Sequence, residues 1–222
     1  MEMLKKLREK NPGLKIFSVT DPEFAPYGRI LDIGDVSELA NAMEGTIMPE
    51  TGNTYRANDE KLISLDAVSK IRRVAFGMMP VEAGYCNGHG FTMNAMEYHK
   101  CSEVNFSTTG CVLILALPCQ LHDGYLDSNE AVAFYLPPMT VVEVFPLVMH
   151  YAPCRTQENG FNCLVVLEDG VNGALDAVNT KAADEEKLLW AVGKWLTAHV
   201  DSKNAANGAF PGITGPNWEL NI

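Results

Sequence analysis

Two glutamates and a histidine lie close together near the middle of the chain. In the segment MEYHKCSEV (residues 96–104), Glu97, His99 and Glu103 all fall on odd positions. Successive side chains of a β-strand point to opposite faces, so a straight strand would place these three on one face. On a solvent-exposed face they would need no partner. On a buried face, two carboxylates and an imidazole are costly unless they are paired or bind a metal ion. Parity alone leaves both alternatives open.

A second acid and imidazole occur in the mostly apolar segment PPMTVVEVFPLVMHYAPC (residues 137–154), which contains Glu143 and His150. Pro146 cannot donate to a strand ladder, so this segment is expected to form a strand, a turn and a second strand. A lone histidine among apolar residues is more often a satisfied core residue than a ligand, but a charged glutamate between valines needs a partner. We expect the two segments to face each other across the inside of a barrel.

Imidazole and carboxylate together suit a divalent ion such as Zn, Mn, Fe, Ni or Co, whereas a soft thiolate site needs clustered cysteines. Three ligands from the first segment and His150 from the second would leave positions open for water or substrate, as a catalytic metal requires. Glu143, on the open side of such a site, is the expected general base or the group that holds a substrate hydroxyl.

The composition argues against several classes of function. The chain has 222 residues, of which 47% are apolar, so a globular protein with a large core is expected. Its net charge of −11 and its lack of a Lys/Arg run argue against nucleic acid and anionic membranes as partners. The N-terminal segment does not resemble a secretory signal, and no segment approaches the roughly 18 apolar residues of a membrane span. The six scattered cysteines, without a CxxC pair, favour reduced thiols and a cytoplasmic location.

The apolar periodicity places the polar segments in a β-rich domain. Helices are expected over residues 2–10 and from Asp35 onward, with a strand at 14–19 and a short helix or turn at 60–70. From about residue 72 strands dominate, and the candidates are RVAFGMM, FTMNAMEYHK, EVNFSTT, CVLILALP, AVAFYLP, TVVEVFPLVMH and FNCLVVLED. Seven or more strands without intervening helices predict a sandwich or a barrel.

The C-terminal part is expected to pack on the outside of this barrel. In ADEEKLLWAVGKWLTAHV (residues 183–200), apolar residues recur at helical spacing, which predicts an amphipathic helix. The tail at residues 201–222 is rich in Gly and Pro and is expected to wrap the surface. We therefore expect one domain over residues 1–222, with a barrel core at about 72–170.

The two polar segments resemble the metal-binding motifs of the cupins, which are small double-stranded jelly-roll barrels. The first cupin motif has His-x-His with Glu four residues later, and EYHKCSE supplies Glu97-x-His99 and then Glu103. The second motif brings a histidine after a turn that contains proline, and FPLVMH supplies His150. The resemblance implies an all-β jelly-roll barrel with N-terminal α/β decoration and a C-terminal helix. It also implies that Glu97, His99, Glu103 and His150 are metal ligands, with glutamate in place of the first histidine.

A closer resemblance is to ureidoglycolate lyase and its cupin relatives. The similar phrases, in order, are FAPYG (24–28), EYH followed by Ser-Glu (97–103), CVLILALP (111–118), MHYAP (149–153) and FNCLVVLED (161–169). Three features depart from that family: Tyr151 stands where a second histidine occurs, Glu103 is acidic where a neutral polar residue occurs, and the part after residue 180 has no counterpart. These departures also fit a separate bacterial cupin family without an assigned activity.

The resemblance implies a metal-dependent enzyme that acts on a small hydroxy acid or sugar-like metabolite by lyase-type chemistry. Aldose–ketose isomerisation of a sugar or sugar phosphate is the alternative, because related cupins hold a hydroxy-carbonyl unit at a metal bound by His and Glu. A non-catalytic metabolite-binding cupin and a structural barrel with mutually paired polar residues also remain open. A homodimer is expected, since cupins often pair.

Three further residues are candidates for substrate binding. Arg155 follows the second motif and is suited to a carboxylate or phosphate, with a rim salt bridge as the alternative. His89 lies in the glycine-flanked turn NGHG and is expected at the barrel rim, with an exposed loop position as its alternative. Tyr151 is included through the resemblance, because it replaces the second histidine of the lyase phrase.

Overall fold

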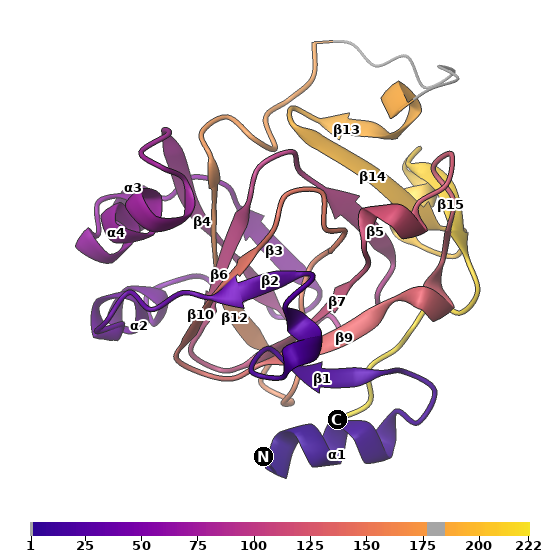
Figure 1. Ribbon diagram of the computed structural model, residues 1–222, viewed down its shortest axis with the longest axis horizontal. Helices are drawn as coiled ribbons and strands as arrows, with labels where there is room; N and C mark the ends of the chain where they lie inside the picture. The colour runs from indigo at the N-terminus through magenta and orange to yellow at the C-terminus, as the bar shows by residue number, and fades with distance from the viewer. Residues whose placement is uncertain (1, 177–184) are drawn as a thin grey trace.

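The computed structural model describes residues 2–176 and 185–222, and its centre consists of two curled sheets that face each other (Figure 1). The larger sheet is antiparallel throughout and has the order β2 (Gly28–Ile30), β10 (Thr140–Val144), β6 (Glu103–Ser107), β12 (Phe161–Glu168), β4 (Val81–Gly88) and β3 (Asn53–Arg56). The smaller sheet has the order β1 (Ile16–Ser18), β9 (Val132–Leu136), β7 (Cys111–Leu115) and β11 (Cys154–Arg155). The predicted jelly-roll β-barrel is confirmed.

A third sheet closes one end of the barrel. Its order is β13 (Leu189–Ala191), β14 (Lys194–His199), β15 (Phe210–Thr214) and β8 (Leu126–Asp127), and β5 (Ala95–Tyr98) pairs with β14. The remaining short elements are η1 (Pro22–Phe24), η2 (Pro118–Gln120), η3 (Ser128–Glu130), η4 (Glu185–Leu188) and α5 (Lys203–Ala206). Through β5, this sheet joins the C-terminal part of the chain to the segment that carries the first polar motif.

Alternation along the strands decides what lies between the two main sheets. In β6, Val104 and Phe106 pack on the outer face, whereas Glu103 and Asn105 point into the barrel beside Leu113 of the opposite sheet. The buried apolar residues between the sheets include Cys86, Leu115, Phe134, Val144, Phe161, Cys163 and Val165. The barrel interior therefore combines apolar side chains with the polar side chains of Glu103 and Asn105.

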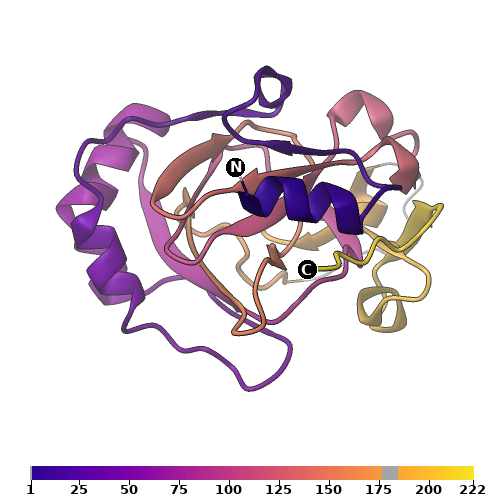
Figure 2. The same cartoon turned by 90° about the horizontal axis from the view of Figure 1, so that it is seen from below.

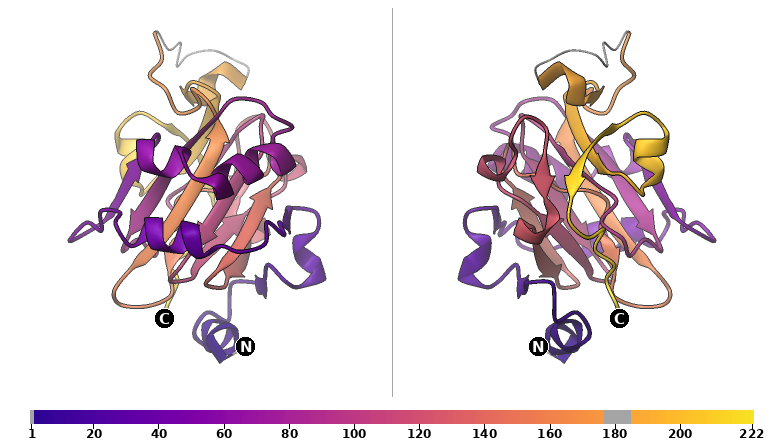
Figure 3. Two further views of the ribbon diagram at one scale, coloured as in Figure 1. Left: turned by 90° about the vertical axis from the view of Figure 1, so that its left-hand side faces the viewer. Right: turned by 90° about the vertical axis from the view of Figure 1, so that its right-hand side faces the viewer.

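Three helices cover the outer face of the larger sheet: α2 (Ser37–Met43), α3 (Glu60–Ile63) and α4 (Asp66–Ala75) (Figure 3, left). The apolar sides of α2 and α4 pack on the outward residues of β6 and β12. Burying a side chain such as Leu39 of α2 contributes about 1.5–3 kcal/mol. This layer fixes the larger sheet from behind and leaves its inner face to the barrel.

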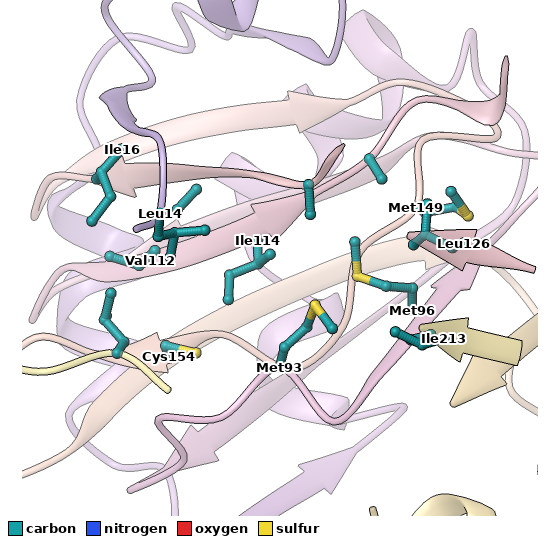
Figure 4. Close-up of a cluster of buried hydrophobic side chains, with 14 of the residues drawn as sticks. Leu14, Ile16, Met93, Met96, Val112, Ile114, Leu126, Met149, Cys154 and Ile213 are labelled. Atoms are coloured by element: carbon teal, nitrogen blue, oxygen red, sulfur yellow. The ribbon is translucent and has the colours of Figure 1, made fainter. Parts of the chain in front are cut away.

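The outer face of the smaller sheet is covered by segments from both ends of the chain. Helix α1 (Glu2–Lys10) lies against it with both chain termini close by (Figure 2). Met93, Met96 and Ile213 complete the same cluster around Ile114 (Figure 4). No helix among residues 2–176 and 185–222 has the length and apolar character needed to cross a bilayer.

Three sequence predictions of secondary structure differ from the structure. The segment RVAFGMM ends helix α4 instead of forming a strand, because Val68 and Ile71 already set a helical apolar spacing that packs on the larger sheet. The helix predicted at 183–200 is replaced by η4 and the hairpin of β13 and β14, while residues 183 and 184 lie outside the described residues. The tail also contributes a strand, β15, instead of only wrapping the surface.

Candidate functional site

The first polar motif meets the second through a single β-bridge. The amide of Glu97 donates to the carbonyl of His150 at 2.6 Å, and the amide of His150 donates to the carbonyl of Glu97 at 2.8 Å. Directly opposed residues of an antiparallel pair project to the same face, so this bridge brings the two side chains together. His99 follows β5 directly, and its carbonyl accepts from the amide of Leu147 at 2.8 Å, which fixes the turn before His150.

Backbone carbonyls orient both imidazoles in the same way. Nδ1 of His99 lies 3.0 Å from the carbonyl oxygen of Gly193, and Nδ1 of His150 lies 2.9 Å from that of Val148. A carbonyl can only accept, so each Nδ1 carries a proton and donates it. The Nε2 atom of each ring is thereby directed toward the shared site, and the ring centroids are 5.4 Å apart.

Two carboxylates face these nitrogens. Nε2 of His99 lies 3.9 Å from Oε1 of Glu97 and 3.8 Å from Oε2 of Glu103, while Nε2 of His150 lies 3.2 Å from Oε2 of Glu103. The other oxygen of Glu103 accepts from Nδ2 of Asn105 at 2.8 Å. All four acidic and imidazole side chains are buried, so their mutual contacts replace those with water.

The charges of these groups depend on one another. Burial opposes ionisation of Glu103, but the neighbouring His150 and His99 outweigh it and lower its pKa to about 2. Burial likewise opposes protonation of His150, but the Glu103 carboxylate raises its pKa to about 9. His99 differs, because burial and the charge of His150 lower its pKa. The neutral His99 therefore offers a lone pair to the site.

The donor set fits a divalent transition metal. One ligand atom each from Glu97, His99 and His150 lie within 4.8 Å of one another, and Glu103 contacts both imidazoles. Within the described parts of the chain, Nε2 of His99 is buried without a hydrogen-bond partner. A buried polar atom left unsatisfied costs about 1–3 kcal/mol, and a bound metal ion would remove that cost. Mixed imidazole and carboxylate ligands suit Zn, Mn, Fe, Co or Ni.

A polar cavity of about 710 Å³ opens beside this cluster. Glu97, Glu103 and His150 contribute to its wall. The same cavity is lined by five asparagines: Asn53, Asn94, Asn105, Asn172 and Asn204. A small polar molecule in this cavity would meet the candidate metal ligands at one end and amide hydrogen-bonding groups around it.

Lys194 also reaches this cavity, and the sequence did not point to it. Its Nζ lies 2.5 Å from Oε2 of Glu97, and its side chain is 16% exposed. Burial opposes the ammonium form, but the Glu97 carboxylate outweighs it and raises the pKa of Lys194. On the amphipathic helix predicted for residues 183–200, this lysine would lie opposite the apolar residues, on the solvated face. The glycine directly before it, Gly193, was the signal that a turn interrupts that segment.

The predicted base Glu143 lies on the other side of the sheet. In the pairing of β10 with β6, Glu143 is opposite Val104, which faces the helix layer, and Val144 is opposite Glu103. The Glu143 carboxylate accepts from Nε of Arg29 at 2.7 Å and from Oγ of Ser102 at 2.7 Å. Strand alternation thus separates Glu143 from the cavity, and its carboxylate is held by Arg29 and Ser102.

The structure places one of the three candidates for substrate binding at the cavity and the other two away from it. Tyr151 lines the cavity, and its hydroxyl oxygen accepts from Nδ2 of Asn204 at 2.7 Å. Arg155 is not part of the cavity lining and instead contacts Glu158 and stacks over the ring of Phe91. His89 is also absent from that lining, and its Nε2 lies 3.0 Å from the carbonyl oxygen of Pro49. Neither Arg155 nor His89 is therefore placed to hold a ligand at the cluster.

Comparison of the sequence with protein families gives a match over residues 16–218 to the family described as "Domain of unknown function (DUF4867)". The chain belongs to this family. The match includes the two polar motifs, the barrel strands and the hairpin that carries Lys194. No curated protein matches the chain in sequence.

Two solved structures show a distant similarity to the chain. EvdO2 from Micromonospora carbonacea var. aurantiaca, complexed with 2-oxoglutarate, is 13% identical, with a TM-score of 0.44, over 69% of this chain and 92% of that chain. A variant of Bacillus subtilis oxalate decarboxylase OxdC is 11% identical, with a TM-score of 0.35, over 57% of this chain and 28% of that chain. In another alignment with oxalate decarboxylase, this chain covers 24% of the length of the other protein. Similarities this weak do not identify a reaction or a substrate.

Proposed function

We propose that the protein is a metal-dependent enzyme of cupin type that acts on a small hydroxy acid or sugar-like metabolite, with lyase-type chemistry. The observation that carries this proposal concerns Nε2 of His99, which is buried and has no hydrogen-bond partner among the described residues. It faces His150, Glu97 and Glu103, which line a polar cavity. Most buried polar side-chain atoms have a hydrogen-bond partner, so an unsatisfied Nε2 that faces three other candidate ligands supports a bound ion at this place.

His99 and His150 would hold the metal through Nε2, with the carboxylates of Glu97 and Glu103 beside them. A divalent metal bound there would polarise hydroxyl, carbonyl or carboxylate oxygens of a substrate. Two backbone carbonyls keep the imidazole rings in place, so the ligand geometry needs little reorganisation. Apolar residues between the sheets, such as Leu113 and Val165, pack beside the cavity.

Tyr151 is the second group that we assign to the substrate. Its hydroxyl oxygen accepts from Asn204, so the phenolic proton is available to a ligand in the cavity. Burial raises the pKa of Tyr151, which keeps the phenol neutral and able to donate. With Glu143 on the outer face of the sheet, proton transfer falls to groups of the cavity wall, of which Glu97 and Tyr151 are the candidates.

Aldose–ketose isomerisation is the second candidate function. The five asparagines of the cavity wall favour it, because side-chain amides both donate to and accept from the hydroxyls of a sugar. Lyase and isomerase share the requirement for two substrate oxygens on neighbouring carbons and for a proton acceptor near them.

Metal analysis tests the proposal directly. Protein purified without chelators is expected to carry about one divalent transition metal per chain, measured by plasma mass spectrometry. His99→Ala and His150→Ala are each expected to lose most of this metal, because a two-histidine set loses half of its nitrogen ligands. His122→Ala is the matched control, since His122 is exposed and lies outside the cavity. Wild-type protein without stoichiometric metal, even after incubation with Zn²⁺, Mn²⁺ and Fe²⁺, contradicts the proposal.

Turnover of the metal-loaded protein then separates a catalyst from a binding protein. The panel consists of ureidoglycolate, sugar acids and ketoses, with product formation followed by mass spectrometry. Glu143→Gln is expected to keep both metal and turnover, because it lies on the outer face. Binding of a panel member without turnover would instead support the non-catalytic metabolite-binding cupin.

A further inference from the structure

The tip of the hairpin between β13 and β14 supplies two contacts to the candidate metal centre. Gly193 has a φ of 63° and presents its carbonyl oxygen to Nδ1 of His99. The next residue, Lys194, forms an ion pair with Glu97 through Nζ and Oε2, which are 2.5 Å apart. The pairing of β14 with β5 holds this tip in register, with Leu196 opposite Glu97. The hairpin is therefore part of the site and not only a cover for it.

The contacts of Lys194 leave donors for a ligand. An ammonium group has three N–H donors, and Glu97 is its one ion-pair partner among the described residues. The lysine side chain lines the same cavity as Tyr151 and His150. Because the side chain is largely buried, water satisfies the other donors only to a limited extent. A ligand oxygen in the cavity is well placed to accept from them.

The charges of the site favour an anion once a divalent metal is bound. The carboxylates of Glu97 and Glu103 would together neutralise the two positive charges of the metal. Imidazoles that bind a metal through Nε2 have lost the proton of that atom, so they would add no charge. The ammonium of Lys194 then leaves the buried site with one positive charge in excess. A second lysine at the cavity, Lys203, is exposed and shares the rim with Asp201, so these two cancel. An uncompensated buried charge is costly, and one carboxylate on the ligand would remove that cost.

We propose that Lys194 contacts the substrate and binds its carboxylate beside the metal, so that the substrate class is a small hydroxy acid and not a neutral sugar. This inference rests on the proposed metal-dependent function and deepens it. The same ammonium holds Oε2 of Glu97, which leaves Oε1 facing His99. Lys194 thereby both positions one candidate ligand and selects the charge of the substrate. It favours hydroxy-acid lyase chemistry over isomerisation of a neutral aldose or ketose.

Binding of a matched pair of probes to the cobalt-loaded protein tests this role. Glycerate and glycerol differ in one carboxylate against one CH₂OH group, and their binding is followed by the visible absorption of Co²⁺ and by calorimetry. Wild-type protein is expected to bind glycerate more tightly than glycerol. Lys194→Met keeps the aliphatic stem and removes the charge, and it is expected to keep Co²⁺ but to weaken glycerate binding by about tenfold or more. Its affinity for glycerol is expected to stay unchanged.

Lys203→Met is the matched control, since it removes a lysine of the same cavity that does not contact Glu97. It is expected to change glycerate affinity by less than about twofold, because an exposed charge is screened by solvent. Where Lys194→Met fails to fold, as judged by circular dichroism, Lys194→Gln replaces it, because a neutral amide can still donate to Glu97.

The possible outcomes separate this inference from the proposed function. Bound Co²⁺ with equal glycerate affinity in wild type and Lys194→Met overturns the role of Lys194 and leaves the metal site standing. Equal affinity of the wild type for glycerate and glycerol overturns it as well. A wild type that binds no stoichiometric Co²⁺ contradicts the proposed function instead.

Discussion

Glu82 is a buried acid that takes no part in the candidate site. The residue is 5% exposed, and its Oε2 accepts from the amide of Gly170 at 3.2 Å. Its Oε1 has no hydrogen-bond partner among the described residues. Burial, together with the nearby charge of Asp169, raises the pKa of Glu82 above its ordinary value. The ionised form of this residue is therefore a source of instability in the folded protein.

This pKa shift predicts a pH-dependent effect of Glu82→Gln. An acid whose pKa is higher in the folded than in the unfolded state destabilises the fold as pH rises through the interval between the two values. Below the unfolded value both states are protonated, and the penalty is absent. We expect Glu82→Gln to have a higher melting temperature than wild type at pH 8, because the neutral amide avoids the cost of the buried carboxylate.

Melting temperatures measured from pH 4 to pH 8 check this expectation. The difference between the variant and wild type should shrink toward zero at the acid end of the series. Glu130→Gln, at an exposed acid, provides the control and should show no such trend. A Gln variant that is less stable than wild type at pH 8 would show that the Glu82 carboxylate is compensated after all.

The residue types and their spacing predicted that Glu97, His99, Glu103 and His150 come together. They did not predict the backbone contacts that bring these residues together. The parity argument assumed one straight strand, whereas β5 ends at Tyr98 and β6 begins at Glu103. The contact between Glu97 and His150 depends instead on a β-bridge between distant segments, which no local pattern specifies. The position of Glu143 was open to prediction, since it alternates with Val142 and Val144, and valines that face the core turn the glutamate away from it.

At the scale of elements, the hairpin of β13 and β14 shows where sequence reasoning failed. The segment after residue 184 places apolar residues at both helical and strand spacing, so its periodicity does not decide between them. Its strand form is stabilised by pairing with β5, which is remote in sequence, and with β15, which follows later in the chain. Only Gly193 marks the turn locally, and a helix interior tolerates a single glycine at modest cost.

The glycine at this turn offers a test of the hairpin as part of the site. Gly193 has a φ of 63°, and an added Cβ would lie 3.3 Å from Cγ2 of Val171. We expect Gly193→Ala to lose about 1–2 kcal/mol of unfolding free energy, the usual cost of a left-handed non-glycine residue. It should also weaken metal binding by about tenfold or more, because the carbonyl that orients His99 shifts.

Gly77→Ala is the matched control for this experiment. Gly77 has a φ of 55°, an added Cβ there meets no atom within 4 Å, and the residue follows α4 on the far side of the larger sheet. It should lose a similar amount of stability in urea denaturation while keeping its metal affinity, measured by competition with a chromogenic chelator. Equal metal affinities in the two variants would mean that the hairpin tip does not position His99.

At the scale of the whole molecule, the β-rich core was predictable and the closing sheet was not. Strands β6, β7, β9, β10 and β12 all coincide with apolar runs that the sequence marks. Both faces of these strands are buried. One face lies between the two sheets, and the other lies under the helices behind the larger sheet or under α1 behind the smaller sheet. The order of the strands depends on long-range pairing, such as Leu196 with Glu97, and composition and periodicity contain no information about such pairs.

The candidate ligands come from three separate parts of this architecture: β5 and the residue after it, the start of β6, and the bridge that contains His150. An unfolded chain does not bring these parts together, so a metal binds the folded state in preference. By mass action, a metal at about one hundred times its Kd adds about 2.7 kcal/mol of stability. Chelation is therefore expected to lower Tm by about 5–10 °C.

Differential scanning calorimetry with and without EDTA checks this coupling, and restoring the metal should restore Tm. The decisive comparison is with His99→Ala. If the coupling runs through the cluster, EDTA changes the Tm of this variant by less than about 1 °C, because little metal is left to remove. If chelation lowers the Tm of both proteins equally, the stabilising ion binds elsewhere in the chain. The buried Nε2 of His99 is then satisfied by water or by a rearranged Glu103. In that case the ion pairs of the cluster, and not a metal, hold these segments together.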